Sequence, residues 1–233
     1  MALTRSPEHA PGGRGETALA RELAGDSAAV RRDNAEAFSC WAEALEILTD
    51  LGKAADAARV ASKLASAEEA SGLTEQACIH YAQAADFYKL AGDAHRVPMR
   101  LNNLAMLRRA GGELEEAAVL LRRALDEASK CHGRAHAETA LIAANLGAVL
   151  FECGDLLGAE QHHMQAMGIR EGLFGPTHPE VGLSLGHIAV IHQARGDLKR
   201  AQSFYAAALQ ILDQFPRLHQ NERAVLRENL EGL

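Results

Sequence analysis

The chain has 233 residues, of which 48% are hydrophobic but only 4% aromatic, and its formal net charge is −7. Few aromatic residues and abundant alanine favour closely packed helices, because a β-sheet would need aromatic and β-branched side chains. The negative charge disfavours nucleic acid as a partner, and no apolar run approaches the roughly 20 residues of a membrane-spanning helix. Four cysteines without a C-x-x-C pair indicate free thiols in a reducing compartment, so we expect a cytoplasmic protein.

The first 14 residues, MALTRSPEHAPGGR, contain two prolines and two adjacent glycines and predict a disordered leader. Arg5 and Arg14 would suit a transit peptide for import into an organelle, which is the alternative interpretation. Glu8 and the lack of an amphipathic pattern disfavour that alternative. Residues 15–233 contain no long low-complexity linker and are expected to form one continuous domain.

From residue 15 onward the apolar pattern predicts five antiparallel helix pairs, each with a first (A) helix and a second (B) helix. The predicted pairs are 15–28 with 34–49, 54–71 with 74–90, 97–111 with 114–130, 137–153 with 156–172, and 179–195 with 198–214. The repeat units are therefore 15–49, 54–90, 97–130, 137–172 and 179–214. A last helix at 219–231 has no successor to stack on, and its charged face predicts a C-terminal cap.

Three kinds of position recur at steps of 40 or 42 residues, which identifies the chain as an internal repeat. The turn between the two helices carries a glycine, at Gly72, Gly112, Gly154 and Gly196. A small residue precedes the turn, at Ala65, Ala105, Gly147 and Ala189. A bulky residue follows it on the B helix, at Trp41, Tyr81, Leu121 and Tyr205. The first unit departs from the pattern, because Arg32 stands where the turn glycine is expected.

These positions have a physical reason. Glycine tolerates the left-handed backbone at a helix end, and small residues let the two helices of a unit approach closely. The bulky residues are expected to fill the space between units. One unit cannot bury its apolar face alone, so that neighbouring units must stack and share their stability.

The repeat resembles the tetratricopeptide repeat, and residues 95–214 resemble its kinesin-light-chain-like subfamily. The segment Gly175-Pro176-Thr177-His178-Pro179 matches the G-x-x-H-P mark of that subfamily, and Leu101-Asn102-Asn103-Leu104-Ala105 matches its L-N-N-L-A helix. The resemblance implies an all-α, right-handed superhelical solenoid of about five helix pairs plus the C-terminal capping helix. It also implies that the A helices line a concave groove that holds an extended or helical peptide of a protein partner.

Carried over position by position, the resemblance predicts which residues line the groove. Its predicted centre is Asn102, Asn103, Met106, Asn145 and Phe151, and further predicted members are Arg109, Ala148, Glu152, His187 and Val190. The remaining candidates are Ser62, Lys63, Ser66, Glu69, Ala144, Leu183, Gly186 and Gln193. An asparagine amide can donate to and accept from a peptide backbone, and methionine and phenylalanine supply adaptable apolar contact. The alternative for Asn103 and Asn145 is that they only tie adjacent A helices together.

The clamp of co-chaperones that hold the carboxyl tail of heat-shock proteins is not expected here. Those relatives use lysine, asparagine and arginine at set groove positions. The corresponding positions of this chain are Ser62, Ser66, Asn102, Met106, Ala144 and Ala148. A mixed groove of this kind favours an internal peptide or a partner helix over a free carboxylate.

No metal site, cofactor or catalytic site is predicted. A zinc site is one interpretation of the residues Cys131, His132, His136, Cys153, His162 and His163. Zinc needs three or four converging ligands, and adjacent helical residues such as His162 and His163 point about 100° apart, so no zinc site is expected. His136 and His178 are instead expected to cap helix starts, and Cys78 and Cys153 to be small core residues. The sequence contains no nucleophile elbow, phosphate-binding loop or H-E-x-x-H motif, so we expect no enzymatic activity.

The sequence therefore predicts a scaffold or adaptor that binds a protein or peptide partner in its groove. The alternative is a structural subunit or assembly factor that uses the convex face or the ends. A peptide-sensing regulator is a third, less favoured interpretation, because no effector domain is left over. Nucleic acid and membrane insertion are not expected.

Overall fold

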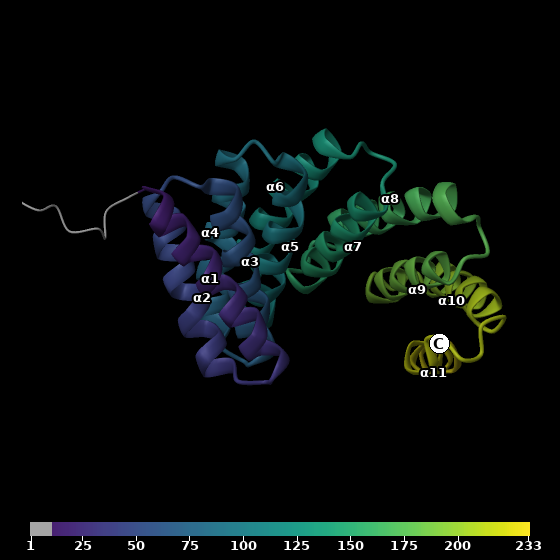
Figure 1. The fold of residues 1–233 in the computed structure, drawn as a ribbon. Helices are drawn as coiled ribbons and strands as arrows, with labels where there is room; N and C mark the ends of the chain where they lie inside the picture. Colours follow the sequence, from purple (N-terminus) through teal and green to yellow (C-terminus); the bar gives the residue numbers. More distant parts are fainter. Residues whose placement is uncertain (1–10) are drawn as a thin grey trace, which may run out of the picture. The chain divides into compact units, whose positions relative to one another are not determined.

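The computed structural model describes residues 11–233, and this part of the chain consists of helices and short connections without a strand (Figure 1). The helices are α1 (Pro11–Val30), α2 (Asn34–Asp50), α3 (Ala54–Ala70), α4 (Thr74–Leu90), α5 (Val97–Ala110), α6 (Leu114–Cys131), α7 (Ala137–Glu152), α8 (Leu156–Phe174), α9 (Pro179–Ala194), α10 (Leu198–Leu212) and α11 (Gln220–Glu231). A short 3-10 turn, η2 (Ala94–Arg96), precedes α5. The predicted all-α fold of repeated helix pairs is confirmed.

The first helix begins earlier than predicted. Residues 1–10 of the predicted leader lie outside the described residues, but α1 already includes residues 11–14. Two contacts stabilise this first turn: Thr17 Oγ1 donates to the Gly13 carbonyl at 2.8 Å, and Arg14 Nη2 pairs with Asp50 Oδ2 of α2 at 2.7 Å. Proline at a helix start also loses no hydrogen bond, since its position has no partner for an N–H.

The helices also group into two larger compact units, one ending at Leu104 and the other beginning at Ala105, so the boundary lies within α5. We call these two the first unit and the second unit, and we call each of the five helix pairs a repeat unit. In the first unit α1 packs on α2, α2 on α3, and α3 on α4. In the second unit α6 packs on α7, α7 on α8, α8 on α9, α9 on α10, and α10 on α11. Each of these helices thus packs on its neighbour in sequence, as a helical repeat requires.

The predicted turn glycines have the expected left-handed backbone. Their φ angles are +76° at Gly72, +83° at Gly112, +83° at Gly154 and +78° at Gly196. At Gly72 the turn closes through two backbone bonds, from Gly72 N to the Glu69 carbonyl and from Leu73 N to the Glu68 carbonyl. This pair of bonds is the Schellman motif, which satisfies the last carbonyls of the A helix.

Arg32 takes the glycine's place in the first repeat unit and has the same left-handed conformation, with φ +63°. Its N–H bonds to the Ala29 carbonyl and that of Asp33 to the Ala28 carbonyl, so that the motif forms despite the side chain. A left-handed residue with a Cβ costs roughly 1–2 kcal/mol.

We therefore expect Arg32→Gly to raise the free energy of unfolding by roughly 1 kcal/mol, because it removes this strain, although glycine also adds entropy to the unfolded chain. Urea unfolding followed by circular dichroism measures the change. The matched reverse substitution, Gly72→Arg, should lower the free energy of unfolding by a similar amount. An Arg32→Gly variant that is less stable than the natural chain would contradict the strain argument.

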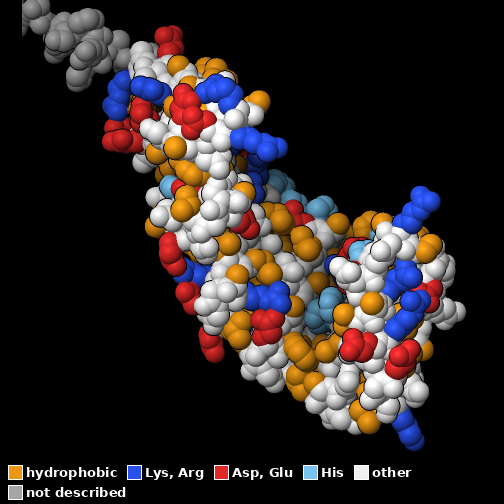
Figure 2. All heavy atoms as spheres, turned by 90° about the horizontal axis from the view of Figure 1, so that it is seen from below, with side chains coloured by type: hydrophobic (Ala, Val, Ile, Leu, Met, Phe, Trp, Pro, Cys, Tyr) orange, Lys and Arg blue, Asp and Glu red, His pale blue; other side chains and the backbone are white. Residues whose placement is uncertain are grey.

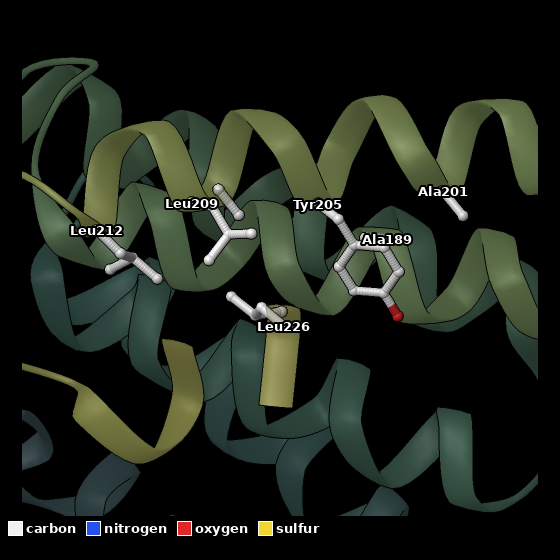
Figure 3. Packing of buried hydrophobic residues seen from close by; sticks show 7 residues of the cluster. Ala189, Ala201, Tyr205, Leu209, Leu212 and Leu226 are labelled. Atoms are coloured by element: carbon white, nitrogen blue, oxygen red, sulfur yellow. The ribbon is translucent and has the colours of Figure 1, made fainter. Parts of the chain in front are cut away.

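In the last helix pair a bulky residue of the B helix meets a small residue of its own A helix, whereas the sequence analysis expected the bulky residues to fill the space between repeat units. Tyr205 of α10 is fully buried and its ring points toward Ala189 of α9 (Figure 3). Leu226 of α11 belongs to the same apolar cluster and is 7% exposed, so α11 covers the side of the last helix pair. The other predicted bulky positions, Trp41, Tyr81 and Leu121, are buried as well.

His163 is the bulky residue of the fourth repeat unit, a role that the sequence analysis did not assign. It lies 42 residues after Leu121 and 42 before Tyr205, and its side chain is buried. The facing residue is Gly147, where an added Cβ would lie 2.7 Å from His163 Cδ2. Gly25 faces Trp41 in the same way, with 2.6 Å between an added Cβ and the indole Cδ1. Glycine thus replaces alanine where the opposing ring needs the space of a methyl group.

Candidate partner-binding surface

The predicted groove residues of the first unit lie on α3 and on the first half of α5. Asn102 is 4% exposed and its Nδ2 donates to Asn103 Oδ1 at 3.4 Å. The Asn102 amide is therefore largely enclosed, and half-buried Asn103 presents more surface to a partner.

A hydrogen-bond network holds this part of the surface in place. The Tyr81 hydroxyl of α4 donates to Glu69 Oε2 at 2.6 Å, lies 3.2 Å from Ser66 Oγ, and also interacts with Asn103. Burial and then the Glu69 carboxylate raise the pKa of Tyr81, so the hydroxyl stays protonated and continues to donate. These contacts link Asn103 to the B helix α4, whereas the alternative interpretation had it tie adjacent A helices together.

Lys63, another predicted groove residue, is occupied by α1. Its Nζ lies 2.7 Å from Glu22 Oε1 and 2.7 Å from Asp26 Oδ1, and Glu22 is itself buried. Asp26 also accepts from the Trp41 indole at 3.0 Å. This ion cluster fastens α1 to α2 and α3, and it leaves the Lys63 charge compensated.

In the second unit two predicted groove residues bind each other. Arg109 Nε donates to Glu152 Oε1 at 2.9 Å and to Oε2 at 3.1 Å, and Nη2 forms a further short contact with Oε1. This ion pair raises the pKa of Arg109 and joins the end of α5 to the end of α7. Both side chains are about one third exposed, so a partner would meet a paired rather than a free charge.

The middle of the second-unit surface is half-buried and, apart from Asn145, apolar. Met106, Asn145, Ala148, Phe151 and Val190 are all neither fully buried nor fully exposed. Asn145 already has an interaction within the chain. Such partly accessible apolar side chains can lose further surface to a partner without any rearrangement of the helices.

A cavity of about 300 Å³ extends this surface between α9 and α11. The predicted residues Leu183, Gly186, His187 and Val190 line it from α9. Asn221, Glu222, Val225, Leu226 and Asn229 line it from α11, and the sequence analysis missed them. Their one signal in the sequence was the apolar spacing of Leu226 and Leu230, one helical turn apart, in a helix that otherwise looked like a polar cap.

His187 sits at the edge of the cavity with its ring 4.8 Å from that of His163. Desolvation lowers the pKa of His187, and the nearby Arg170 charge lowers it further. The lowered pKa favours the neutral form of the ring, in which one nitrogen donates and the other accepts.

The two histidines of the connections between repeat units act as predicted. His136 Nδ1 accepts from the Glu138 N–H at 3.2 Å, and His178 Nδ1 accepts from the Glu180 N–H at 3.3 Å. Each ring also packs on the ring four residues earlier, His132 or Phe174. Within residues 11–233 no three histidine, cysteine or acidic side chains are grouped as a metal site would require.

The cysteine prediction is right at one position and wrong at the other. Cys78 is buried, but Cys153 is exposed. Helix α7 ends at Glu152, one residue before the predicted end, so Cys153 falls into the solvent-facing turn beside Gly154. The thiol therefore takes no part in the core.

The exposed face of the molecule in Figure 2 carries hydrophobic side chains at several places, with charged side chains between them. On the B helices, Ile79 and Val119 occupy the same repeat position and are 56% and 62% exposed. Leu157 of α8 is 60% exposed. In the part of the chain that the structure describes, no helix is both long enough and apolar enough to cross a membrane.

Two protein families match the sequence. The family described as Tetratricopeptide repeat matches residues 138–214, and the family described as Soluble NSF attachment protein, SNAP, matches residues 20–151. The second match covers more than half of the chain. No curated protein is significantly similar to the chain in sequence.

Solved structures share the fold. BtubC (BKLC) from P. vanneervenii is 23% identical with a TM-score of 0.70, over 91% of this chain and 85% of that one. A putative kinesin light chain from P. anserina with nearly identical TPR-like repeats is 17% identical with a TM-score of 0.66, over 88% and 98%. RapI in its apo form is 15% identical with a TM-score of 0.78, over 90% of this chain and 57% of that chain. At these identities the similarity shows the fold alone.

Proposed function

We propose that this chain, which is a tetratricopeptide repeat protein and belongs to the soluble NSF attachment protein family, is a non-enzymatic scaffold that holds a segment of a partner protein on its A helices. The observation that carries the proposal is that Met106, Phe151 and Val190, apolar residues at predicted groove positions of the second unit, are all half-buried, and that Val190 also lines the cavity between α9 and α11; we call these three residues the apolar strip. The name of the SNAP family, which describes attachment to another protein, agrees with a binding role.

The chemistry of this strip suits an apolar segment with a polar backbone. The cavity is large enough for one or two apolar side chains, and amides of Asn221 and Asn229 stand at its α11 wall. The charges beside the strip are already paired, as the contacts of Arg109 with Glu152 illustrate. Binding would therefore come chiefly from apolar burial rather than from ion pairs.

The test compares two matched double variants. Partners are first identified by crosslinking mass spectrometry on purified complexes, and the affinity of the identified partner is then measured by calorimetry. We expect Phe151→Ala with Val190→Ala to weaken binding roughly tenfold or more, because hot-spot side chains contribute more than about 1 kcal/mol each. Circular dichroism must show unchanged helicity in both variants.

The matched control replaces exposed apolar residues of the B helices, Val119→Ser with Leu157→Ser, and should leave the affinity unchanged. The opposite pattern, in which the B-helix variant loses affinity for the partner and the A-helix variant keeps it, would contradict the groove proposal. It would favour the second candidate, a subunit or assembly factor that docks through its convex face. The exposure of Ile79 and Val119 at one repeat position is the observation that favours this second candidate.

A further inference from the structure

Equivalent residues meet wherever one repeat unit follows another, and we call them junction positions. At the junction of the second and third repeat units they are Tyr88 on α4, Arg96 just before α5, and Arg100 on α5. At the junction of the fourth and fifth repeat units the repeat steps lead from these to Arg170, Glu180 and Ser184. The two junctions can therefore be compared residue by residue.

The junction of the fourth and fifth repeat units compensates its own charge. Arg170 is 8% exposed, its Nη2 lies 3.0 Å from Glu180 Oε2, and its Nη1 donates to Ser184 Oγ at 2.7 Å. A cation that is buried so deeply needs such a carboxylate, because a buried ion pair that loses one partner leaves an uncompensated charge and is strongly destabilised. Here the A helix supplies the counter-charge.

The junction of the second and third repeat units has the opposite arrangement. Its A-helix positions hold two arginines, and the guanidinium carbon of each lies 5.6 Å from the centroid of the Tyr88 ring. Tyr88 is 3% exposed and carries no charge, so it attracts the guanidinium groups without neutralising them. Both arginines thus converge on one buried ring.

Little within the chain compensates these two charges. Arg96 forms an ion pair with Asp93, three residues earlier, through a contact of 3.2 Å at the surface, and such pairs contribute little. Arg100 Nε donates to Ser62 Oγ at 3.0 Å, which is a neutral partner, and Arg100 makes no ion pair with any residue in the described range. The junction therefore retains about one uncompensated positive charge.

The same contacts place this charge on the candidate surface of the first unit. Ser62 is a predicted groove residue of α3, and it fixes the Arg100 side chain between α3 and α5. Burial raises the pKa of Tyr88, but hydrogen bonds with Ser62, Arg100 and Arg96 outweigh it and lower the pKa. The guanidinium groups are thus gathered around the Tyr88 hydroxyl rather than turned away into solvent.

We propose that Arg96 and Arg100, positioned by Tyr88 and Ser62, bind a carboxylate of an acidic segment in the partner protein. The inference rests on the proposed function, because it assigns the acidic segment to the partner held on the A helices. A side-chain carboxylate matches the single uncompensated charge and the planar fork of an arginine. The site differs in position from the heat-shock carboxylate clamp, since neither arginine stands at a clamp position.

The direct test uses a fluorescein-labelled decaglutamate peptide and measures fluorescence anisotropy at low salt with the full chain. We expect binding that the double variant Arg96→Gln with Arg100→Gln weakens at least tenfold. The matched control, Arg123→Gln with Arg134→Gln, removes two exposed arginines of the second unit and should change the affinity less than twofold. A labelled decaglutamine peptide should not bind.

The proposal would be overturned by no binding of decaglutamate, by equal losses in both double variants, or by equal binding of decaglutamine. A melting curve checks that each variant is folded. Arg100→Lys provides a milder second variant that keeps the charge but loses the fork, and we expect it to weaken decaglutamate binding about threefold. A phosphoserine peptide of the same length that binds tenfold more tightly would overturn the carboxylate assignment in favour of a phosphate.

The peptide assay separates this inference from the proposed function. If decaglutamate binding follows the arginines but Phe151→Ala with Val190→Ala leaves partner affinity unchanged, the groove proposal fails while the anion site stands. If the groove variant loses the partner but neither decaglutamate nor the partner responds to Arg96→Gln with Arg100→Gln, only the anion site fails. The two proposals can therefore fail independently.

Discussion

Tyr205→Ala is expected to lower the free energy of unfolding of the second unit by about 3–5 kcal/mol, the range for removing a large buried aromatic side chain. Tyr205 has no exposed surface, and its ring fills the space between α9, α10 and α11 beside Ala189 and Leu226 (Figure 3). Its hydroxyl also donates to Gln193 Oε1 at 2.5 Å. Because repeat units stabilise one another, the loss should spread to the neighbouring helices α9 and α11.

Guanidinium chloride unfolding, followed by circular dichroism, measures the change. Tyr205→Phe separates the two contributions, because it keeps the ring and loses only the hydroxyl with its hydrogen bonds to Gln193 and Asn229, and we expect a loss of about 1 kcal/mol. Leu198→Ala, at a 46% exposed position of the same helix, is the matched control and should cost less than about 1 kcal/mol. If Tyr205→Ala costs no more than this control, the packing argument is wrong.

The repeat was predictable because it depends on local and periodic features. Turn glycines report a backbone conformation that few other residues adopt, and their spacing repeats along the chain. The helix ends followed from the same glycines to within a few residues. The start of α1 was not predictable in this way, because it depends on the pairing of Arg14 with Asp50, 36 residues away.

The candidate site was harder to predict, because position on a helix face does not reveal which side chains are already engaged. Arg109 and Glu152 both stand at predicted groove positions, yet they pair with each other across 43 residues. Asn102 also stands at such a position, but it is 4% exposed. The repeat register could have suggested the Arg109–Glu152 pair, since 42-residue steps place residues 109 and 151 at equivalent positions of successive A helices.

Residues that differ between repeats at one position were informative about the packing. His163 was not predicted as the bulky residue of the fourth repeat unit, because a histidine does not resemble the tyrosine or leucine of the other repeat units. Gly147, in a series of alanines, was the signal that an unusually placed ring lies opposite. In Tyr81 and Tyr205 the buried ring ends in a hydroxyl that donates to Glu69 and Gln193. The corresponding acceptor position in the fourth repeat unit is Phe151, and His163 Nδ1 is left buried without a hydrogen bond.

This orphaned imidazole predicts that acid destabilises the second unit. Burial lowers the pKa of His163 to about 3, and the neighbouring His187 and Arg170 contribute to the shift. In the unfolded chain the pKa returns to about 6.5, so between these values the unfolded state binds a proton that the folded state does not. Above about pH 6.5, His163 therefore does not reduce the free energy of unfolding. As the pH drops toward 3, this one group reduces it by at most about 1.4 kcal/mol per pH unit.

His163→Leu should reduce this acid sensitivity, because leucine is the residue of the third repeat unit at the same position and does not titrate. Urea unfolding between pH 7.5 and 4.5, a range that covers the upper part of this pH window, gives the slope of stability against pH for each variant. The slope of His163→Leu should be lower than that of the natural chain by up to about one proton, and the control Leu198→Ala, which changes no titratable group, should keep the natural slope. Some slope will remain in His163→Leu, because desolvation also lowers the pKa of His162 and His187. Equal slopes in the natural chain and in His163→Leu would contradict the claim that burial beside Gly147 lowers the pKa of His163.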